Sequence, residues 1–220
     1  MNTLRIPILL AAISLASLGN VFAQAYDISS GGQPTITGAL SGSVTGASDT
    51  QSDLSVTINF GELSPINTSG IVEVVVPIGV RSTLPFQVTA QVTGAVNANA
   101  QAIQGSDIGF GLGNLRKNGP QSLVCTFSNY VFASPFNNDP VSVVFIGPNG
   151  RAAYPASLGN LTTPTTIFSG PRISGNNARR IGNNAGIFDA TFVIMPQFYA
   201  AGSSSITITF SISAGPAVPC

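Results

Sequence analysis

The chain has 220 residues, of which 44% are hydrophobic and only 7% are charged. This balance excludes an intrinsically disordered protein and a charged coiled coil. Eight basic and eight acidic residues give a net charge of zero, so the sequence predicts no cationic surface for nucleic acid. Histidine and tryptophan are absent, which removes the commonest general base, the commonest metal ligand and the strongest sugar-stacking side chain.

Residues 1–23 have the pattern of a signal peptide. One positive charge, Arg5, precedes an apolar run from Ile6 to Leu18, and Val21 and Ala23 are small residues that signal peptidase accepts. The apolar run is too short to span a bilayer, which takes about 20 residues. The sequence therefore predicts a protein with no transmembrane segment in its mature chain, secreted or at the cell surface after passage through the periplasm.

The mature chain contains a long alternating segment, Gln33–Thr45. Side chains that alternate with period two indicate an extended strand rather than a helix. Gly31 and Gly32 before it and residues 46–53 after it have the composition of flexible tethers. The apolar face of the segment consists of Ile36, Gly38, Leu40, Gly42 and Val44.

Runs of Val, Ile and Phe between turn residues predict the remaining strands. The run Ile71–Val76 is nearly continuous, which predicts burial on both faces, and Pro77 should limit its pairing. Gly94 should close the strand that starts at Phe86. Glycines at alternate positions of Asp107–Leu115 leave one face without side chains, so this strand must bend or be packed closely. The predicted strands are 54–60, 71–76, 86–92, 107–115, 123–127, 141–146, 165–168, 188–195 and 205–213.

Strand spacing and turn residues together predict the fold class, which is an all-β, antiparallel β-sandwich. No segment has a compelling helical period. The predicted organisation is a signal peptide at 1–23, a Gly/Ser/Thr-rich N-terminal segment at 24–52 and the sandwich domain at 53–220.

Motifs for catalysis, phosphate binding or metal binding are missing from the sequence. The carboxylates are scattered, and a pair such as Glu62 and Asp189 would have to meet in space to serve a glycosidase. Turn formation or a solvated strand position is the favoured interpretation of each carboxylate. The sequence therefore predicts no enzyme, no cofactor and no metal site.

Cys125 and Cys220 are the only cysteines. An exported chain meets an oxidising compartment, where a bridge between them would close a loop of about 95 residues and contribute about 4–5 kcal/mol in the chain-entropy model. We predict this intramolecular disulfide. The alternatives are two free thiols or an intermolecular bridge through the terminal Cys220.

Two parts of the chain resemble a known group of exported proteins. The first is Asn59–Pro65, followed by a Val/Ile strand and by Leu84–Val88. The second is the closing pair, Gly186–Phe192 and the Thr-rich final strand. Across about half of the mature chain this pattern resembles the pilin-like β-sandwiches of the chaperone-usher and spore coat protein U group. Those families commonly place a disulfide near the first strand, whereas Cys125 and Cys220 lie elsewhere.

This resemblance implies an immunoglobulin-like sandwich that a neighbour completes with a strand. It implies a structural or adhesin-like subunit that assembles on the cell surface with copies of itself or related subunits, with a periplasmic chaperone as a further partner. The alternating segment is then a candidate donor strand, since the nine residues from Ile36 to Val44 reach about 30 Å. The alternative is that the segment is the first strand of its own domain. The low charge supports assembly independently, because few charges leave strand edges unprotected.

A second hypothesis is a monomeric secreted module that binds a carbohydrate or another surface ligand. Its candidate ligand loop contains two Asn pairs around two adjacent arginines. The residues proposed for it are Asn176, Asn177, Arg179 and Arg180.

Overall fold

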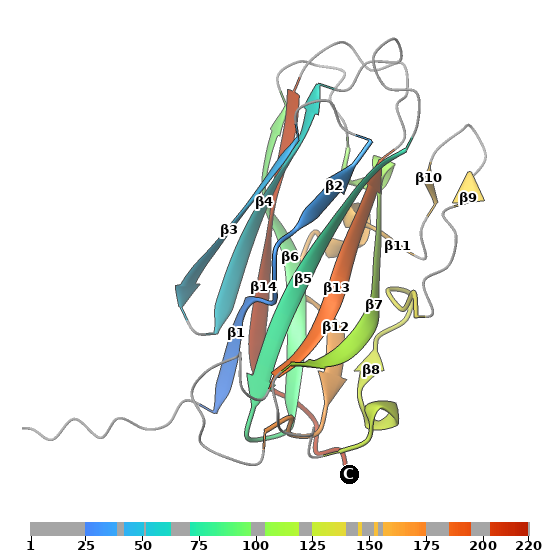
Figure 1. Ribbon diagram of the computed structural model, residues 1–220. Coiled ribbons are helices and arrows are strands. Elements are labelled where there is room, and N and C mark those ends of the chain that lie inside the picture. Colours follow the sequence, from blue (N-terminus) through green and yellow to red (C-terminus); the bar gives the residue numbers. More distant parts are fainter. Residues whose placement is uncertain are drawn as a thin grey trace, which may run out of the picture.

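The computed structural model describes residues 25–38, 42–50, 52–62, 71–97, 104–118, 125–139, 145–146, 152–153, 156–174, 185–194 and 203–219. These residues form an all-β protein in which two six-stranded antiparallel sheets face each other (Figure 1). The described residues contain short 3₁₀ turns but no α-helix. The predicted signal peptide, the candidate ligand loop and Cys220 lie outside the described residues.

One edge of the first sheet is formed by two short strands, which lie one after the other along the same neighbouring strand. Both β1 and β2 pair with β5, and the order across the sheet is then β5, β13, β7 and β11. The strands are β1 (Tyr26–Ser30), β2 (Thr35–Thr37), β5 (Val72–Ser82), β13 (Ala185–Ile194), β7 (Ile108–Asn118) and β11 (Ala156–Ser157).

The second sheet has the order β3, β4, β14, β6, β12 and β8. Its strands are β3 (Ser43–Thr50), β4 (Asp53–Glu62), β14 (Ser203–Ala214), β6 (Phe86–Asn97), β12 (Thr165–Gly170) and β8 (Val131–Phe132). A separate pair consists of β9 (Phe145–Ile146) and β10 (Ala152–Ala153). The 3₁₀ turns are η1 (Gly105–Asp107), η2 (Phe127–Asn129) and η4 (Leu158–Leu161).

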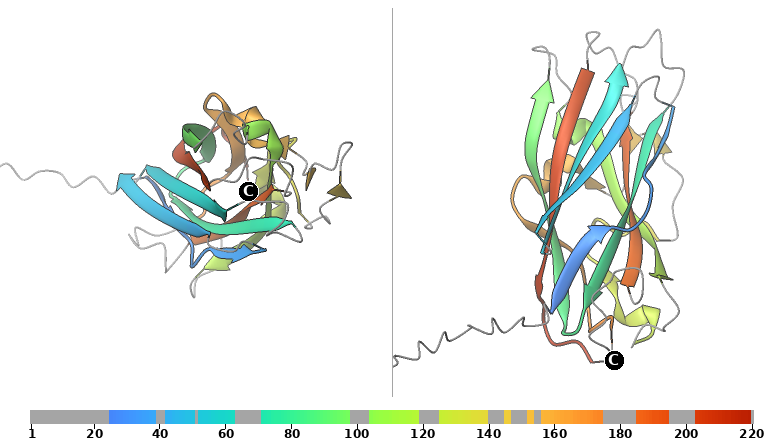
Figure 2. Two further views of the ribbon diagram at one scale, coloured as in Figure 1. Left: turned by 90° about the horizontal axis from the view of Figure 1, so that it is seen from above. Right: turned by 60° about the vertical axis from the view of Figure 1, so that its left-hand side comes forward.

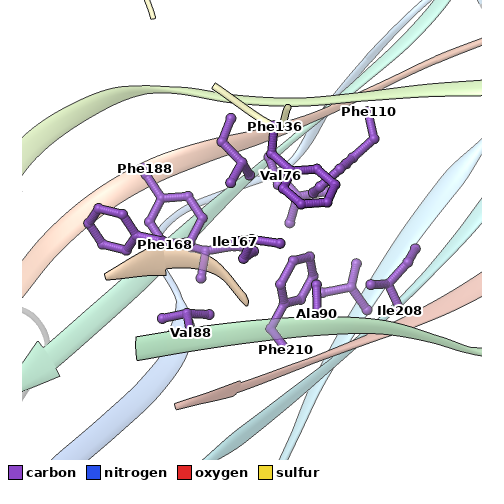
Figure 3. Close-up of a cluster of buried hydrophobic side chains, with 14 of the residues drawn as sticks. Val76, Val88, Ala90, Phe110, Phe136, Ile167, Phe168, Phe188, Ile208 and Phe210 are labelled. Carbon is purple, nitrogen blue, oxygen red and sulfur yellow. The ribbon is translucent and has the colours of Figure 1, made fainter. Parts of the chain in front are cut away.

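Phenylalanine dominates the core between the two sheets (Figure 3). Phe168 of β12 lies between Phe86 of β6 and Phe188 of β13, with ring centroids 5.4 and 5.0 Å apart, so side chains of both sheets meet there. Phe110 of β7 contacts Phe192 of β13 at 5.2 Å. Tilted and edge-on aromatic pairs of this kind add to the stabilisation that burial provides. The core therefore belongs equally to both sheets.

Several predicted strands agree with the structure. Residues 54–60 lie in β4, 86–92 in β6, 165–168 in β12, 188–194 in β13 and 205–213 in β14. In β14 the Ile and Phe side chains are buried, while the Thr and Ser side chains between them are partly or fully exposed. The strand predicted at 107–115 is β7, which curves strongly in Figure 1 and has β10 close to it.

Pro77 limits the pairing of β5 on one side only: pairing with β13 continues through it, and pairing with the edge strands is interrupted there. The residue lies opposite Asp189 of β13, and its other side faces the gap between β1, which ends opposite Ile78, and β2, which starts opposite Val75. Because that edge is interrupted there, the missing N–H of proline breaks no ladder bond to it. The carbonyl of Pro77 still accepts a hydrogen bond from the N–H of Gly31 at 2.8 Å.

The first half of β5 is buried on one face only, which corrects the prediction of burial on both. Val72, Val74 and Val76 are buried, whereas Glu73 and Val75 are partly exposed. The sequence does not show this alternation, because the apolar residue Val75 lies on the outer face between two buried valines.

Gly94 does not end its strand, contrary to prediction. The pairing of β6 with β14 shifts register between Thr207, opposite Gly94, and Ile208, opposite Val92. Thr93 is therefore the extra residue of a β-bulge, and glycine is common at such bulges. Pairing resumes after the bulge, so the strand continues.

The strand predicted at 123–127 is also wrong where the chain is described. Residues 125–129 form a bend and the turn η2. Local hydrogen bonds replace strand pairing there: Thr126 donates its hydroxyl to Oδ1 of Asn129 at 2.6 Å, and Asn129 N–H donates to the carbonyl of Thr126 at 3.1 Å. Of the strand predicted at 141–146, residues 145–146 are described and form β9.

The alternating segment Gln33–Thr45 is not one strand. Its first part, β2, pairs with β5 in the first sheet, and its last part begins β3, which pairs with β4 in the second sheet. Gly38 has φ = 83°, and a Cβ there would overlap the carbonyl oxygen of Ile71, so only glycine fits where the chain leaves β2. Leu40 lies outside the described residues.

Residues 24–52, expected to be a separate N-terminal segment, contribute β1, β2 and β3 to the two sheets. The tether expected at 46–53 is wrong as well, since most of it belongs to β3. Cross-strand pairing with β4 fixes this part of the chain, which its Gly/Ser/Thr-rich composition does not reveal.

Candidate functional site

One edge of the protein, formed by β1, β2 and β3, has a groove between the two sheets. We call this side the β1–β3 edge; it faces the viewer in the right-hand view of Figure 2. The groove has a volume of about 200 Å³. Its walls come from the link between β1 and β2 and from strands β3, β4 and β5. The lining residues are Ser30, Gly32, Gln33, Pro34, Val44, Gly46, Leu54, Val56 and Val76.

The floor of the groove is apolar and its mouth is open. Leu54, Val56 and Val76 form the floor and are at most 3% exposed. Gly46 lies opposite Val56 in the pairing of β3 with β4, so a side chain at 46 would point to the same, inner face. A Cβ there would meet no atom within 4 Å. Such a groove can accept an apolar side chain from outside.

The β1–β3 edge also offers backbone groups for pairing. Within the described chain, β2 pairs only with β5 and β3 pairs only with β4, so each has one side without a strand partner. Neither strand contains lysine, arginine or proline, which commonly protect sheet edges. The opposite edges are the two-residue strands β11 and β8, and such short strands offer little to a second chain. Strand addition is therefore favoured at the β1–β3 edge.

β1 is held more firmly than β2. Asp27 lies opposite Arg81 of β5, and the Arg81 side chain is only 4% exposed. Burial raises the pKa of Asp27, and the nearby Arg81 opposes this shift. Burial lowers the pKa of Arg81, and Asp27 opposes that shift. At the same end of β1, the N–H of Thr83 donates to the carbonyl of Ala25 at 2.9 Å. β2 has three residues and a single ladder.

The predicted donor residues are thus split between the two sheets. Ile36 of β2 and Val44 of β3 are partly buried and pack against the core, and Gly42 lies just before β3. Gly38 is exposed at the end of β2. The structure does not bring these side chains onto one strand face.

The predicted disulfide involves one described residue. Cys125 is buried, and Cys220 lies outside the described residues, so the pairing stays a prediction. Asn129, in the turn after Cys125, donates its side-chain amide to the carbonyl of Pro219 at 3.2 Å. The described chain therefore ends beside the turn that follows Cys125, which supports the predicted pairing.

Asp189 has a structural role that the sequence analysis did not find. It forms an ion pair with Arg116 at 2.8 Å and accepts a hydrogen bond from the side-chain amide of Asn114 at 2.7 Å. Asn114 has φ = 55° and lies where the register of β7 against β13 shifts. The carboxylate thus stabilises a bulge, for which an Asn in the left-handed region is a sequence signal. Glu62, its suggested catalytic partner, is the last residue of β4.

A search for groups of three or more His, Cys, Asp or Glu side chains that could hold a metal ion finds none among the described residues. In the same part of the chain, no helix is long and apolar enough to cross a membrane.

Comparisons with family models, curated proteins and solved structures find no match to this chain. The class that the geometry defines is an all-β protein of two antiparallel sheets around a Phe-rich core. Its function is therefore argued from the groove and the strands at the β1–β3 edge.

Proposed function

We propose that the protein is an exported, non-enzymatic structural subunit, pilin-like and immunoglobulin-like in fold, that assembles at the cell surface with copies of itself or with related subunits. One observation carries the proposal: β3, an eight-residue edge strand without lysine, arginine or proline, lies on one edge together with the short strand β2, and the strands at the opposite edges are two residues long. An edge strand of this kind is a template for pairing with another chain.

Exchange of β2 between copies is the assembly mode that the donor-strand hypothesis now favours. β2 is short, lies at an edge and follows a Gly-rich link, so its pairing with β5 is the easiest to open. An exchanged β2 would make with the neighbour's β5 the same contacts that it makes within its own chain. Such a swap costs little free energy beyond that of bringing two chains together. A periplasmic chaperone would cover the same edge before assembly.

The test is the assembly state of the mature chain, 24–220, measured by size exclusion and by negative-stain imaging of surface material that bears the tagged protein. Polymers or SDS-resistant ladders are expected. Ile36→Asp should abolish the oligomers and leave a folded, strand-rich monomer. Thr35→Asp, on the exposed face of the same strand, is the matched control and should assemble normally.

A sharp monomer with affinity for a glycan would contradict this proposal and favour the alternative, a monomeric binding module. An Ile36→Asp variant that unfolds outright, or one that assembles like the wild type, would contradict exchange of β2.

A further inference from the structure

We propose that the groove at the β1–β3 edge takes the ring of Phe127 from a second copy of the chain, so that copies join edge to edge in an open row. The inference rests on the proposed function, because it adds to the exchange of β2 a second contact between copies of this subunit.

The first observation is an exposed apolar surface on the other side of the molecule. Phe127 in η2 is 50% exposed, and Val131 in β8 is 55% exposed. We call η2 and β8 together the β8 edge. In the described chain, the one other large hydrophobic side chain as exposed as these is Leu84, in the turn between β5 and β6. Phe127 and Val131 are four residues apart in the chain, and exposed apolar side chains that form one patch mark interaction surfaces.

The second observation is that the groove suits an aromatic ring. An apolar cavity of about 150 Å³ is enough to bind benzene. The groove, with about 200 Å³ and a floor of Leu54, Val56 and Val76, has room for the ring of Phe127. A ring that is half exposed to water in the monomer would be transferred to an apolar surface, which is favourable.

The third observation is that the two surfaces lie on opposite edges of the same sheet. β3 and β8 are the first and last strands in the order of the second sheet. Phe127 therefore cannot reach the groove of its own chain. A contact between unlike surfaces on opposite edges does not close on itself, so each added copy presents a new groove and a new ring. The geometry predicts a row of copies rather than a closed dimer.

The fourth observation is charge complementarity between the two sides. Strands β1–β5 contain five acidic residues and one basic residue, a net charge of −4, whereas the described residues from 104 onward contain three basic and three acidic residues and have no net charge. β6, between these two parts in sequence, is uncharged. Arg172 is exposed and lies next to the β8 edge, since its carbonyl accepts a hydrogen bond from the hydroxyl of Tyr130 at 3.0 Å. The acidic strands on one side and the exposed Arg172 on the other favour a head-to-tail encounter of copies.

The experiment uses two variants of the mature chain that each lose one half of the contact. Phe127→Ser removes the ring and keeps the groove, and Gly46→Leu fills the groove mouth and keeps the ring. Sedimentation velocity over a range of concentrations should show self-association weakened about tenfold or more in each variant. Mixed in equal amounts, the two should form one-to-one pairs that grow no further through this contact, because each pair has a filled groove at one end and no ring at the other.

Matched controls exclude general effects of the substitutions. Leu84→Ser removes an equally exposed apolar side chain that belongs to neither η2 nor β8, and Gly94→Leu adds the same side chain to a strand glycine whose Cβ has only ordinary contacts. Both should assemble like the wild type, and circular dichroism should show all four variants folded. Arg172→Glu should weaken association severalfold, and added salt should reduce the difference from the wild type.

The outcomes separate the inference from the proposed function. If the wild type assembles and folded Phe127→Ser and Gly46→Leu variants assemble equally well, this contact is wrong and the proposed function stands. If the mixture forms long rows, or if the two variants fail to complement each other, the pairing of ring and groove is overturned. A wild type that stays monomeric at every concentration overturns both.

Discussion

Phe210→Ala should cost far more stability than Thr209→Ala, although the two residues are neighbours in β14. Phe210 is fully buried and lies opposite Leu54 of β4 and Ala90 of β6 (Figure 3). Thr209 points to the outer face, where its hydroxyl is 3.1 Å from that of Ser55. The two substitutions therefore test opposite faces of one strand.

The magnitudes follow from what each substitution removes. Phe→Ala at a buried site loses the transfer free energy of the ring and leaves a cavity, together about 3–5 kcal/mol. Thr209→Ala loses partly exposed hydroxyl contacts that water replaces, and its cost should stay below about 1.5 kcal/mol. For a protein of this size the first loss corresponds to a fall in Tm of about 6–20 °C.

The assay is urea unfolding of both variants beside the wild type. Unfolding is followed by far-UV circular dichroism, which needs no tryptophan, and is checked by thermal scans. Unchanged m-values would show that the midpoints report stability alone. Equal losses in the two variants would refute the assignment of Phe210 to the core face and, with it, the register of β14.

Three further predictions concern the end of the molecule near Tyr130. Burial raises the pKa of Tyr130 to about 12, despite a backbone hydrogen bond from Cys125 that opposes the shift. Because the folded state favours the neutral phenol, Tyr130 stabilises the fold fully below about pH 10, and this contribution is lost as the pH rises toward 12. Across this range the free energy of unfolding should fall by about 1–2 kcal/mol more for the wild type than for Tyr130→Phe. Gly170→Ala would place its Cβ on the Tyr130 ring and should cost about 1–3 kcal/mol in urea unfolding, whereas Gly186→Ala, whose Cβ has ordinary contacts, should cost less. Non-reducing peptide mapping of freshly exported protein should recover Cys125 linked to Cys220, and two free thiols or a bridge between subunits would contradict the prediction.

The strands that sequence reasoning located correctly are those in which one face is apolar and the other polar. β4 and β14 alternate in this way along most of their length, and each was predicted within a few residues of its bounds. Such a pattern is local information, because burial of one face fixes which side chains must be apolar. The two-residue strands β8 and β11 are too short to show a period, and they depend on pairing with distant parts of the chain.

The segment Gln33–Thr45 shows where the same reasoning fails. Its alternation is real, and Ile36 and Val44 both face the core, yet they do so in different sheets. The chain bends at Gly38, which has a positive φ and separates the two residues. In the sequence, a glycine on the apolar face of a predicted strand can be either a small residue that allows close packing or a residue that adopts a positive φ. The carbonyl of Ile71, distant in sequence, is what requires glycine there, and no local pattern reveals it.

The groove could not be predicted for a related reason, since it is lined by four separate parts of the chain. The charge asymmetry, in contrast, was accessible from the sequence. Five of the eight acidic residues precede residue 74, and six of the eight basic residues follow residue 98. Total charge conceals this, because the two halves cancel.

Gly46→Val should make the monomer more stable and the assembly weaker. Glycine inside a strand costs about 0.5–1 kcal/mol in conformational entropy, and valine is a strong strand former. Position 46 has space for the side chain, whose methyl groups would lie at the groove mouth above Val56 of the floor. Urea unfolding of the monomer should therefore show a gain of about 0.5–1.5 kcal/mol. If the groove binds a second copy, the same valine should reduce self-association in sedimentation experiments. A variant that is more stable and still assembles fully would show that the open groove serves no contact between copies, and a less stable variant would contradict the placement of position 46 on the inner face of β3.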